Sequence, residues 1–104
     1  MSEILRLKDC DEPFLTRRQG ERLRTHLVEL HNRLPPGDSI VVDFSGVEIM
    51  TPSFADECFG KHAEIIGALN FRKHISLVNA DDTIRALVNS VLSERMSRSD
   101  AGAA

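Results

Sequence analysis

The sequence predicts an α/β domain in which a small, mostly parallel central sheet is packed by helices, in the order β-α-β-α-β-α. Two observations support this fold class. Short apolar runs of strand length begin near Ile4, Ile40 and Ile75. Each run is followed by a longer segment whose leucines, isoleucines and valines recur with helical spacing. Such alternation is typical of parallel strands joined by right-handed helical crossovers.

The N-terminal segment predicts one strand and leaves a second one open. Residues 4–7 alternate weakly between apolar and polar side chains, which favours a short strand. A polar stretch follows, and then Phe14 and Leu15 are apolar again. These two residues either add an extra N-terminal strand or pack against the start of the next helix.

The first helix has clear start and stop signals. Thr16 and Gln19 form the two ends of a capping box, in which each side chain bonds the other residue's backbone N–H. Leucines at positions 23, 27, 30 and 34 then form one apolar stripe. Pro35-Pro36-Gly37 ends the helix, because proline lacks an N–H donor and clashes with the preceding turn.

The segment Ile40–Phe44 is the strongest strand prediction, and its continuous apolar character favours burial on both faces. Asp43 is the exception within it. A buried carboxylate needs hydrogen-bond donors, which the start of the next helix or an arginine could supply, so we assign Asp43 a structural role. Ser45-Gly46 then predicts a bend, and Val47 to Ile49 keeps an extended alternation.

The second helix begins between Thr51 and Ser53, and the sequence allows two caps. Thr51 could cap it with Pro52 at the first helical position, or Ser53 could cap it with Asp56 three residues later. The expected inward stripe contains Phe54, Cys58, Ile65, Ile66 and Leu69.

Two acids, Asp56 and Glu57, fall in the first turn of this helix. There they complement the helix dipole, which is a structural role; the alternative is an acidic rim for a partner. Because neighbours on a helix diverge by about 100°, the two carboxylates are poorly placed to act as a catalytic pair.

A third strand is predicted at 75–78, and a third helix carries an apolar stripe from Ile84 to Met96. Residues 97–104 are small and polar and show no periodicity. We therefore expect one domain over residues 1–96 and a disordered C-terminal tail over residues 97–104.

Composition excludes several classes of function. The chain of 104 residues has a net charge of −3 and neither tyrosine nor tryptophan, which argues against nucleic-acid binding. Its two cysteines are far apart, as in a reduced compartment, and no apolar run reaches the ~20 residues that cross a bilayer. We expect a cytoplasmic protein without membrane contact, either a monomer or a homodimer.

Motifs for catalysis or cofactor binding are missing from the sequence. It contains no GxGxxG, GxxxxGK[ST] or GxSxG pattern. Cys58 and His62 stand four apart on the second helix, but two ligands do not make a zinc site. We therefore expect no enzyme activity, no cofactor and no metal.

Three segments carry a family resemblance. They are Phe14-x-Thr16-Arg17, then Asp43-Phe44-Ser45-Gly46-Val47, then Ser53-Phe54-Ala55-Asp56-Glu57. With them the chain resembles a STAS-like domain family of unassigned function, related to the STAS domains of bacterial anti-sigma-factor antagonists. The resemblance implies a STAS-like fold and a signalling module that works by partner switching.

The resemblance also implies a site. In such antagonists a histidine-kinase-like ATPase, the anti-sigma factor, phosphorylates a serine at a helix start, and the unphosphorylated form binds that kinase. The matching position here is Ser53, with Thr51 as a second phosphoacceptor candidate. The antagonists have Asp-Ser-Ser-Gly where this chain has Thr51-Pro52-Ser53-Phe54. The implied partner-binding surface comprises Val47, Glu48, Met50, Thr51, Pro52, Ser53, Phe54 and Glu57, with Met50 and Phe54 as apolar anchors if they are exposed.

A second hypothesis is a small-molecule or nucleotide-binding domain. It would use the same helix N-terminus to hold an anion, since backbone N–H groups point outward there. Arg17 or Arg18 would add positive charge.

Overall fold

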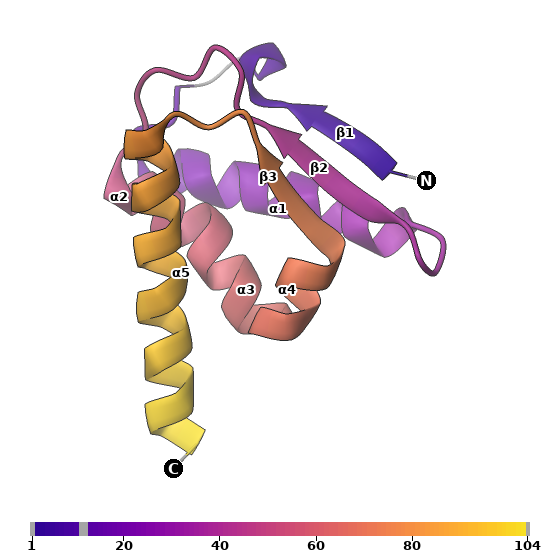
Figure 1. The fold of residues 1–104 in the computed structure, drawn as a ribbon, viewed down its shortest axis with the longest axis vertical. Helices are drawn as coiled ribbons and strands as arrows, with labels where there is room; N and C mark the ends of the chain where they lie inside the picture. Colours follow the sequence, from indigo (N-terminus) through magenta and orange to yellow (C-terminus); the bar gives the residue numbers. More distant parts are fainter. Residues whose placement is uncertain (1, 11–12, 104) are drawn as a thin grey trace.

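The computed structural model describes residues 2–10 and 13–103, the last eight of them by backbone alone. It confirms the predicted α/β class. Three parallel strands form the sheet in the order β1-β2-β3, with β2 in the middle (Figure 1). They are β1 (Ser2–Arg6), β2 (Ser39–Asp43) and β3 (Ile75–Val78).

Only one face of this sheet is covered, contrary to the expectation for the central strand. Ile40 and Val42 of β2 are fully buried, and Phe44 follows on the same side. Val41 and Asp43, which point the other way, remain partly exposed. Their neighbour Ile4 on β1 is 56% exposed. An apolar run alone cannot show how many faces are covered, because that depends on where the helices pack.

The N-terminal segment contains no additional strand among the described residues. After β1 the chain forms a short 3₁₀ helix, η1 (Leu7–Asp9), in which Leu7 is completely buried. Phe14 instead packs edge-on against the ring of Phe54, with centroids 5.3 Å apart. The backbone N–H of Thr51 donates to the carbonyl of Phe14 at 3.0 Å, so this segment is bound to a loop rather than to a strand.

The first helix, α1 (Arg17–Arg33), forms as predicted. Thr16 accepts from the backbone N–H of Gln19, and the Gln19 side chain accepts from the backbone N–H of Thr16. Leu23, Leu27 and Leu30 are buried. The capping box and the apolar stripe therefore both appear where local sequence placed them.

The second helical segment is more complex than one amphipathic helix. It begins as α2 (Pro52–Ala55), widens into the π-helical turn η2 (Asp56–Gly60), continues as α3 (Lys61–Ile66) and stops at Gly67. Gly67 has φ +89°, a left-handed conformation that ends the helix. The chain then starts α4 (Ala68–His74).

The π turn explains why the predicted inward stripe is partly wrong. Ile65 and Leu69 are 68% and 85% exposed, whereas Cys58 and Phe59 are both fully buried. A π turn contains an additional residue, which rotates every later side chain around the helix axis. The break at Gly67 then redirects the backbone before Leu69.

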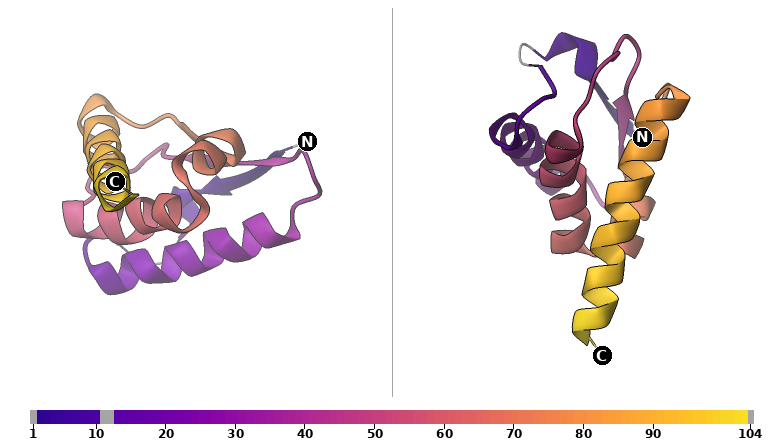
Figure 2. Two further views of the ribbon diagram at one scale, coloured as in Figure 1. Left: turned by 90° about the horizontal axis from the view of Figure 1, so that it is seen from below. Right: turned by 90° about the vertical axis from the view of Figure 1, so that its left-hand side faces the viewer.

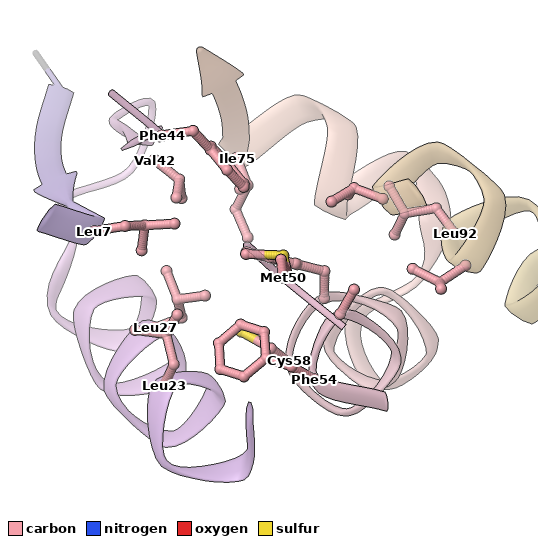
Figure 3. Packing of buried hydrophobic residues seen from close by; sticks show 14 of the residues in the cluster. Leu7, Leu23, Leu27, Val42, Phe44, Met50, Phe54, Cys58, Ile75 and Leu92 are labelled. Atoms are coloured by element: carbon pink, nitrogen blue, oxygen red, sulfur yellow. The ribbon is translucent and has the colours of Figure 1, made fainter. Parts of the chain in front are cut away.

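The hydrophobic core lies between the covered sheet face and the helices. Figure 3 shows Val42, Phe44 and Ile75 of the sheet region facing Leu23, Leu27 and Cys58 of the helices. The segment α2–η2–α3 lies between α1 and the last helix, α5 (Asp82–Ala103), in both views of Figure 2. Both α1 and α5 contact η2.

Helix α5 continues past the position where its apolar periodicity stops. Its backbone is helical to Ala103, whereas the sequence predicted an end near Met96. The side chain of Met96 and all of Ala104 lie outside the described residues. That residues 97–104 form a disordered tail, and that the domain ends at residue 96, stay predictions.

Candidate functional site

The loop that joins β2 to α2 starts at an anchored carboxylate. Asp43 Oδ1 accepts hydrogen bonds from the side-chain amide of Asn79 at 3.0 Å and from the backbone N–H of Ser45 at 2.9 Å. These bonds lower the pKa of Asp43 to about 2. The carboxylate thus connects the ends of β2 and β3, as a structural residue should. Its donors differ from those expected, which were a helix start or an arginine.

Two side chains of this loop enter the core, so part of the predicted partner surface is wrong. Val47 and Met50 are each only 8% exposed, and Phe54 is 1% exposed. These three cannot contact a partner in this conformation. The bend predicted at Ser45-Gly46 is present: the backbone N–H of Val47 donates to the carbonyl of Phe44, and Gly46 has φ +81°. The extended alternation expected after it is not kept, because residues 47–50 belong to no strand and the neighbours Glu48 and Ile49 are both exposed.

The loop residues that face solvent are only partly those predicted. Ile49 is 67% exposed, and Glu48 is exposed beside it. The sequence did not indicate that Ile49 is exposed, because in an extended strand residues 47 and 49 would share one face and both would be buried. This loop is not a strand, so the two side chains point in different directions.

Thr51 caps the second helix, which resolves the open choice of cap. Its Oγ1 accepts from the backbone N–H of Phe54 at 3.2 Å and donates to the carbonyl of Leu15 at 2.6 Å. Pro52 occupies the first turn, where its missing N–H costs nothing. Thr51 therefore fixes both the helix start and the segment before α1.

Ser53 is exposed in the first turn of the same helix. Because Thr51 does the capping, the Ser53 hydroxyl makes no hydrogen bond with any residue that the structure describes. The hydroxyl thus lies on the surface at a helix start, where the resemblance placed a phosphoacceptor.

Asp56, one turn further on, is held by two arginines. Arg95 of α5 donates from Nε at 2.8 Å and from Nη2 at 2.7 Å, and Arg17 of α1 donates at 3.1 Å. The Arg95 hydrogen bonds are the main reason why the pKa of Asp56 falls to about 2. Asp56 is therefore structural, as predicted, and it joins α1, η2 and α5.

Glu57 was expected on the partner-binding surface, but only 6% of it is exposed. Burial opposes its charge, yet hydrogen bonds from Lys61 and Arg24 outweigh burial and lower its pKa. Its Oε2 lies 2.6 Å from Arg24 Nη1 and 2.7 Å from Lys61 Nζ. Two cations thus neutralise Glu57 inside the structure, and it is not available as an acidic rim.

The geometry therefore brings together a smaller surface than the sequence indicated. We call it the loop surface. Its exposed members are Glu48, Ile49, Pro52 and Ser53. Close to it is the Arg17 side chain of α1, which is 54% exposed and donates to Asp56, one helical turn after Ser53. The loop surface thus combines an apolar residue, an acid and an exposed hydroxyl, with a guanidinium nearby.

Across the described part of the chain, no three His, Cys, Asp or Glu side chains are arranged to hold a metal ion. Cys58 is buried, and burial raises the pKa of its thiol. His62 is also completely buried, and both its ring nitrogens lack hydrogen-bond partners. Burial lowers the pKa of His62 to about 4, with smaller contributions from His31 and Arg24.

None of the described helices combines the length and the apolar character that a bilayer-spanning helix requires.

Comparison with known proteins gives one match. The family model of a STAS-like domain of unknown function matches residues 19–85, which include β2, β3 and the loop surface. No curated protein and no solved structure matches the chain. The match covers well over half of the sequence and agrees with a small parallel sheet packed by helices. The chain therefore belongs to the family of STAS-like domains of unknown function.

Proposed function

We propose that this protein is a non-catalytic regulatory module that binds another protein through the loop surface and is switched by phosphorylation of Ser53. The observation that carries the proposal is the Ser53 hydroxyl, which is exposed at a helix start while Thr51 does the capping. A phosphate added there would not remove the cap that holds the helix.

The electrostatics of this position support a switch. A phosphoserine carries about −1.5 to −2 charges near neutral pH, and a helix N-terminus stabilises negative charge. Arg17 already bonds Asp56, three residues after Ser53, at 3.1 Å. A phosphate on Ser53 would compete for this guanidinium and change the charge beside Ile49. The partner would then bind the unphosphorylated form better than the phosphorylated form.

The family resemblance suggests the class of partner, a histidine-kinase-like ATPase of the anti-sigma-factor type. The partner would bind the unmodified loop surface and phosphorylate Ser53. Thr51 is the weaker acceptor candidate, because its hydroxyl donates to the Leu15 carbonyl at 2.6 Å. Phosphorylating Thr51 would require breaking that bond and the cap.

The test is a binding measurement with a purified histidine-kinase-like ATPase of the anti-sigma-factor type. Wild type and Ser53→Ala should bind equally, and Ser53→Asp should bind about tenfold more weakly. Ser90→Asp, an exposed serine on α5, serves as the matched charge control and should bind like wild type. Mass spectrometry after incubation with ATP should place phosphate on Ser53.

Equal binding by all four proteins, with no phosphate on Ser53 or Thr51, would contradict the switch. The alternative is a small-molecule or nucleotide-binding domain that uses the same helix N-terminus, with Arg17 or Arg18 holding the anion. A thermal shift with ATP or GTP, in the absence of any protein partner, would favour that alternative instead.

A further inference from the structure

Three histidines from three different helices lie close together. Between ring centroids, His31 in the last turn of α1 is 6.2 Å from His62 on α3 and 5.1 Å from His74 at the end of α4. We call these three side chains the histidine row. The row connects α1 with both α3 and α4.

One member of the row is a buried polar ring without polar partners. His62 is completely buried, and neither of its ring nitrogens forms a hydrogen bond with a described residue. From α4 the ring of Phe71 meets it edge-on, with centroids 5.7 Å apart. A second proton on His62 would add a charge and another donor where no described group accepts one. A buried group of this kind costs stability if it only fills space, which indicates a role beyond packing.

The charged groups around the row do not offset a proton on it. His31 and Arg24, both on α1, oppose a positive charge on His62. The other charged residues in the last turns of α1 and α4 are also basic, and they are Arg33, Arg72 and Lys73. Three carboxylates of η2 and α3 are already bound by arginine or lysine side chains, and they are those of Asp56, Glu57 and Glu64. No carboxylate in the described part of the chain pairs with any of the three rings.

Helix α4 is the element beside the row that can open by itself. It has seven residues and one buried side chain, Phe71, and the left-handed residue Gly67 separates it from α3. Helix α1 has 17 residues, a capping box and several buried leucines, and α3 is continuous with η2. A helix as short as α4 depends on its packing, so a contact that loses packing energy is expected to open there first.

From the row, its lack of acidic partners and the short helix beside it, we propose that mild acid releases α4 from α1. Histidine is the side chain that ordinarily gains its charge between about pH 8 and pH 5, and charges on His31 and His74 repel each other across this contact. Once α4 moves away, water reaches His62, which takes up a proton as well. The released form exposes Phe71 while the sheet and α1 stay folded. This pH-sensitive latch involves no residue of the loop surface and does not depend on Ser53.

The test is amide hydrogen exchange measured by NMR at pH 7 and pH 5 and corrected for the direct effect of pH on the chemical rate. The backbone N–H of Phe71 donates to Gly67 at 2.9 Å and reports on α4, whereas that of Phe44 donates to Val78 at 2.9 Å and reports on the sheet. The opening constant at Phe71 should exceed that at Phe44 and should depend only weakly on urea. It should be about twentyfold larger at pH 5 than at pH 7, since release returns the pKa of His62 from about 4 to 6.5.

Three variants assign the effect to the row. His62→Phe should lose most of the rise at Phe71. His31→Gln, a change at a half-buried position that the fold tolerates more easily, should lose part of it. His26→Gln, exposed on α1, is the matched control and should keep the whole rise.

Two results would overturn the latch. The first is an equal opening constant and equal urea dependence at Phe71 and Phe44 at pH 5, because acid would then unfold the whole domain rather than release α4. The second is a rise at Phe71 that is absent in wild type, or that persists unchanged in both His62→Phe and His31→Gln, because the row would then not control the opening.

Discussion

Gly20 of α1 lies directly against the carbonyl oxygen of Phe54: a Cβ atom built on Gly20 would be 2.7 Å from that oxygen and 3.0 Å from the Cβ of Glu57. Both partners belong to the segment that begins at Thr51, and one of them is backbone that cannot rotate away. The absence of a side chain at position 20 therefore sets how closely α1 approaches the helix that carries the loop surface.

We predict that Gly20→Ala destabilises the protein despite placing a better helix former in α1. Helix propensity alone would gain about 1 kcal/mol, whereas overpacking in a closely packed contact costs about 1 to 3 kcal/mol. The net loss should appear as a lower urea midpoint with an unchanged slope. Glu21→Ala, exposed at the neighbouring position, is the control and should stay within about 0.5 kcal/mol of wild type. A more stable Gly20→Ala protein would show that α1 can move away freely.

Thr51→Val should cost more stability than Ser53→Ala. Valine keeps the shape of threonine but loses the cap on Phe54 and the bond to Leu15, an expected loss of about 1 to 2 kcal/mol. Ser53→Ala removes an exposed hydroxyl and should change the free energy of unfolding by less than about 0.5 kcal/mol. Thermal unfolding of both variants measures the two losses of stability. The reverse order would identify Ser53 as the cap and remove the basis for a free hydroxyl.

Arg95→Met should weaken the attachment of α5 and raise the pKa of Asp56. The hydrogen bonds of Arg95 are the main cause of the low pKa, about 2, so part of the shift should disappear while Arg17 keeps the rest. A depressed carboxyl pKa stabilises the fold above its unfolded value of 3.8, and this stability is lost as pH falls towards 2. A carbon-detected NMR titration of Asp56 measures the change. Arg85→Met is the control, and a pKa that stays near 2 in Arg95→Met would refute this assignment.

His62 should make the protein less stable in mild acid. Its pKa is lowered from 6.5 to about 4, so the unfolded chain binds a proton that the folded chain excludes. Stability is therefore complete above pH 6.5 and decreases as pH falls towards 4. The difference between pH 7 and pH 5 should be about 2 kcal/mol.

Urea unfolding of His62→Phe at both pH values tests this. The variant should lose most of the difference and should be no less stable than wild type at pH 7, because both ring nitrogens of His62 lack partners. His26→Gln, at an exposed position, should keep the wild-type pH dependence. An unaltered pH dependence in His62→Phe would assign the effect to other groups.

The sequence predicted a structural feature correctly wherever that feature depends only on residues close together in the chain. The capping box of Thr16 and Gln19 needs only residues three apart, and it formed as predicted. The leucine stripe of α1 and the parallel order of the strands followed from periodicity and from the alternation of element types. The sequence also limited the cap of the second helix to Thr51 or Ser53. In the structure Thr51 is the cap and Ser53 lies in the first turn.

The sequence by itself thus determined the α/β class, the start of the first helix and a hydroxyl near the start of the second, since each depends on spacing along the chain. Only the tertiary structure decided which side chains around the loop face solvent. Met50 and Phe54, the predicted apolar anchors, are buried, whereas Ile49 is exposed. The physical reason is that burial depends on what packs opposite a residue. The π turn at Asp56–Gly60 rotates one helix, and Phe14, distant in sequence, covers Phe54.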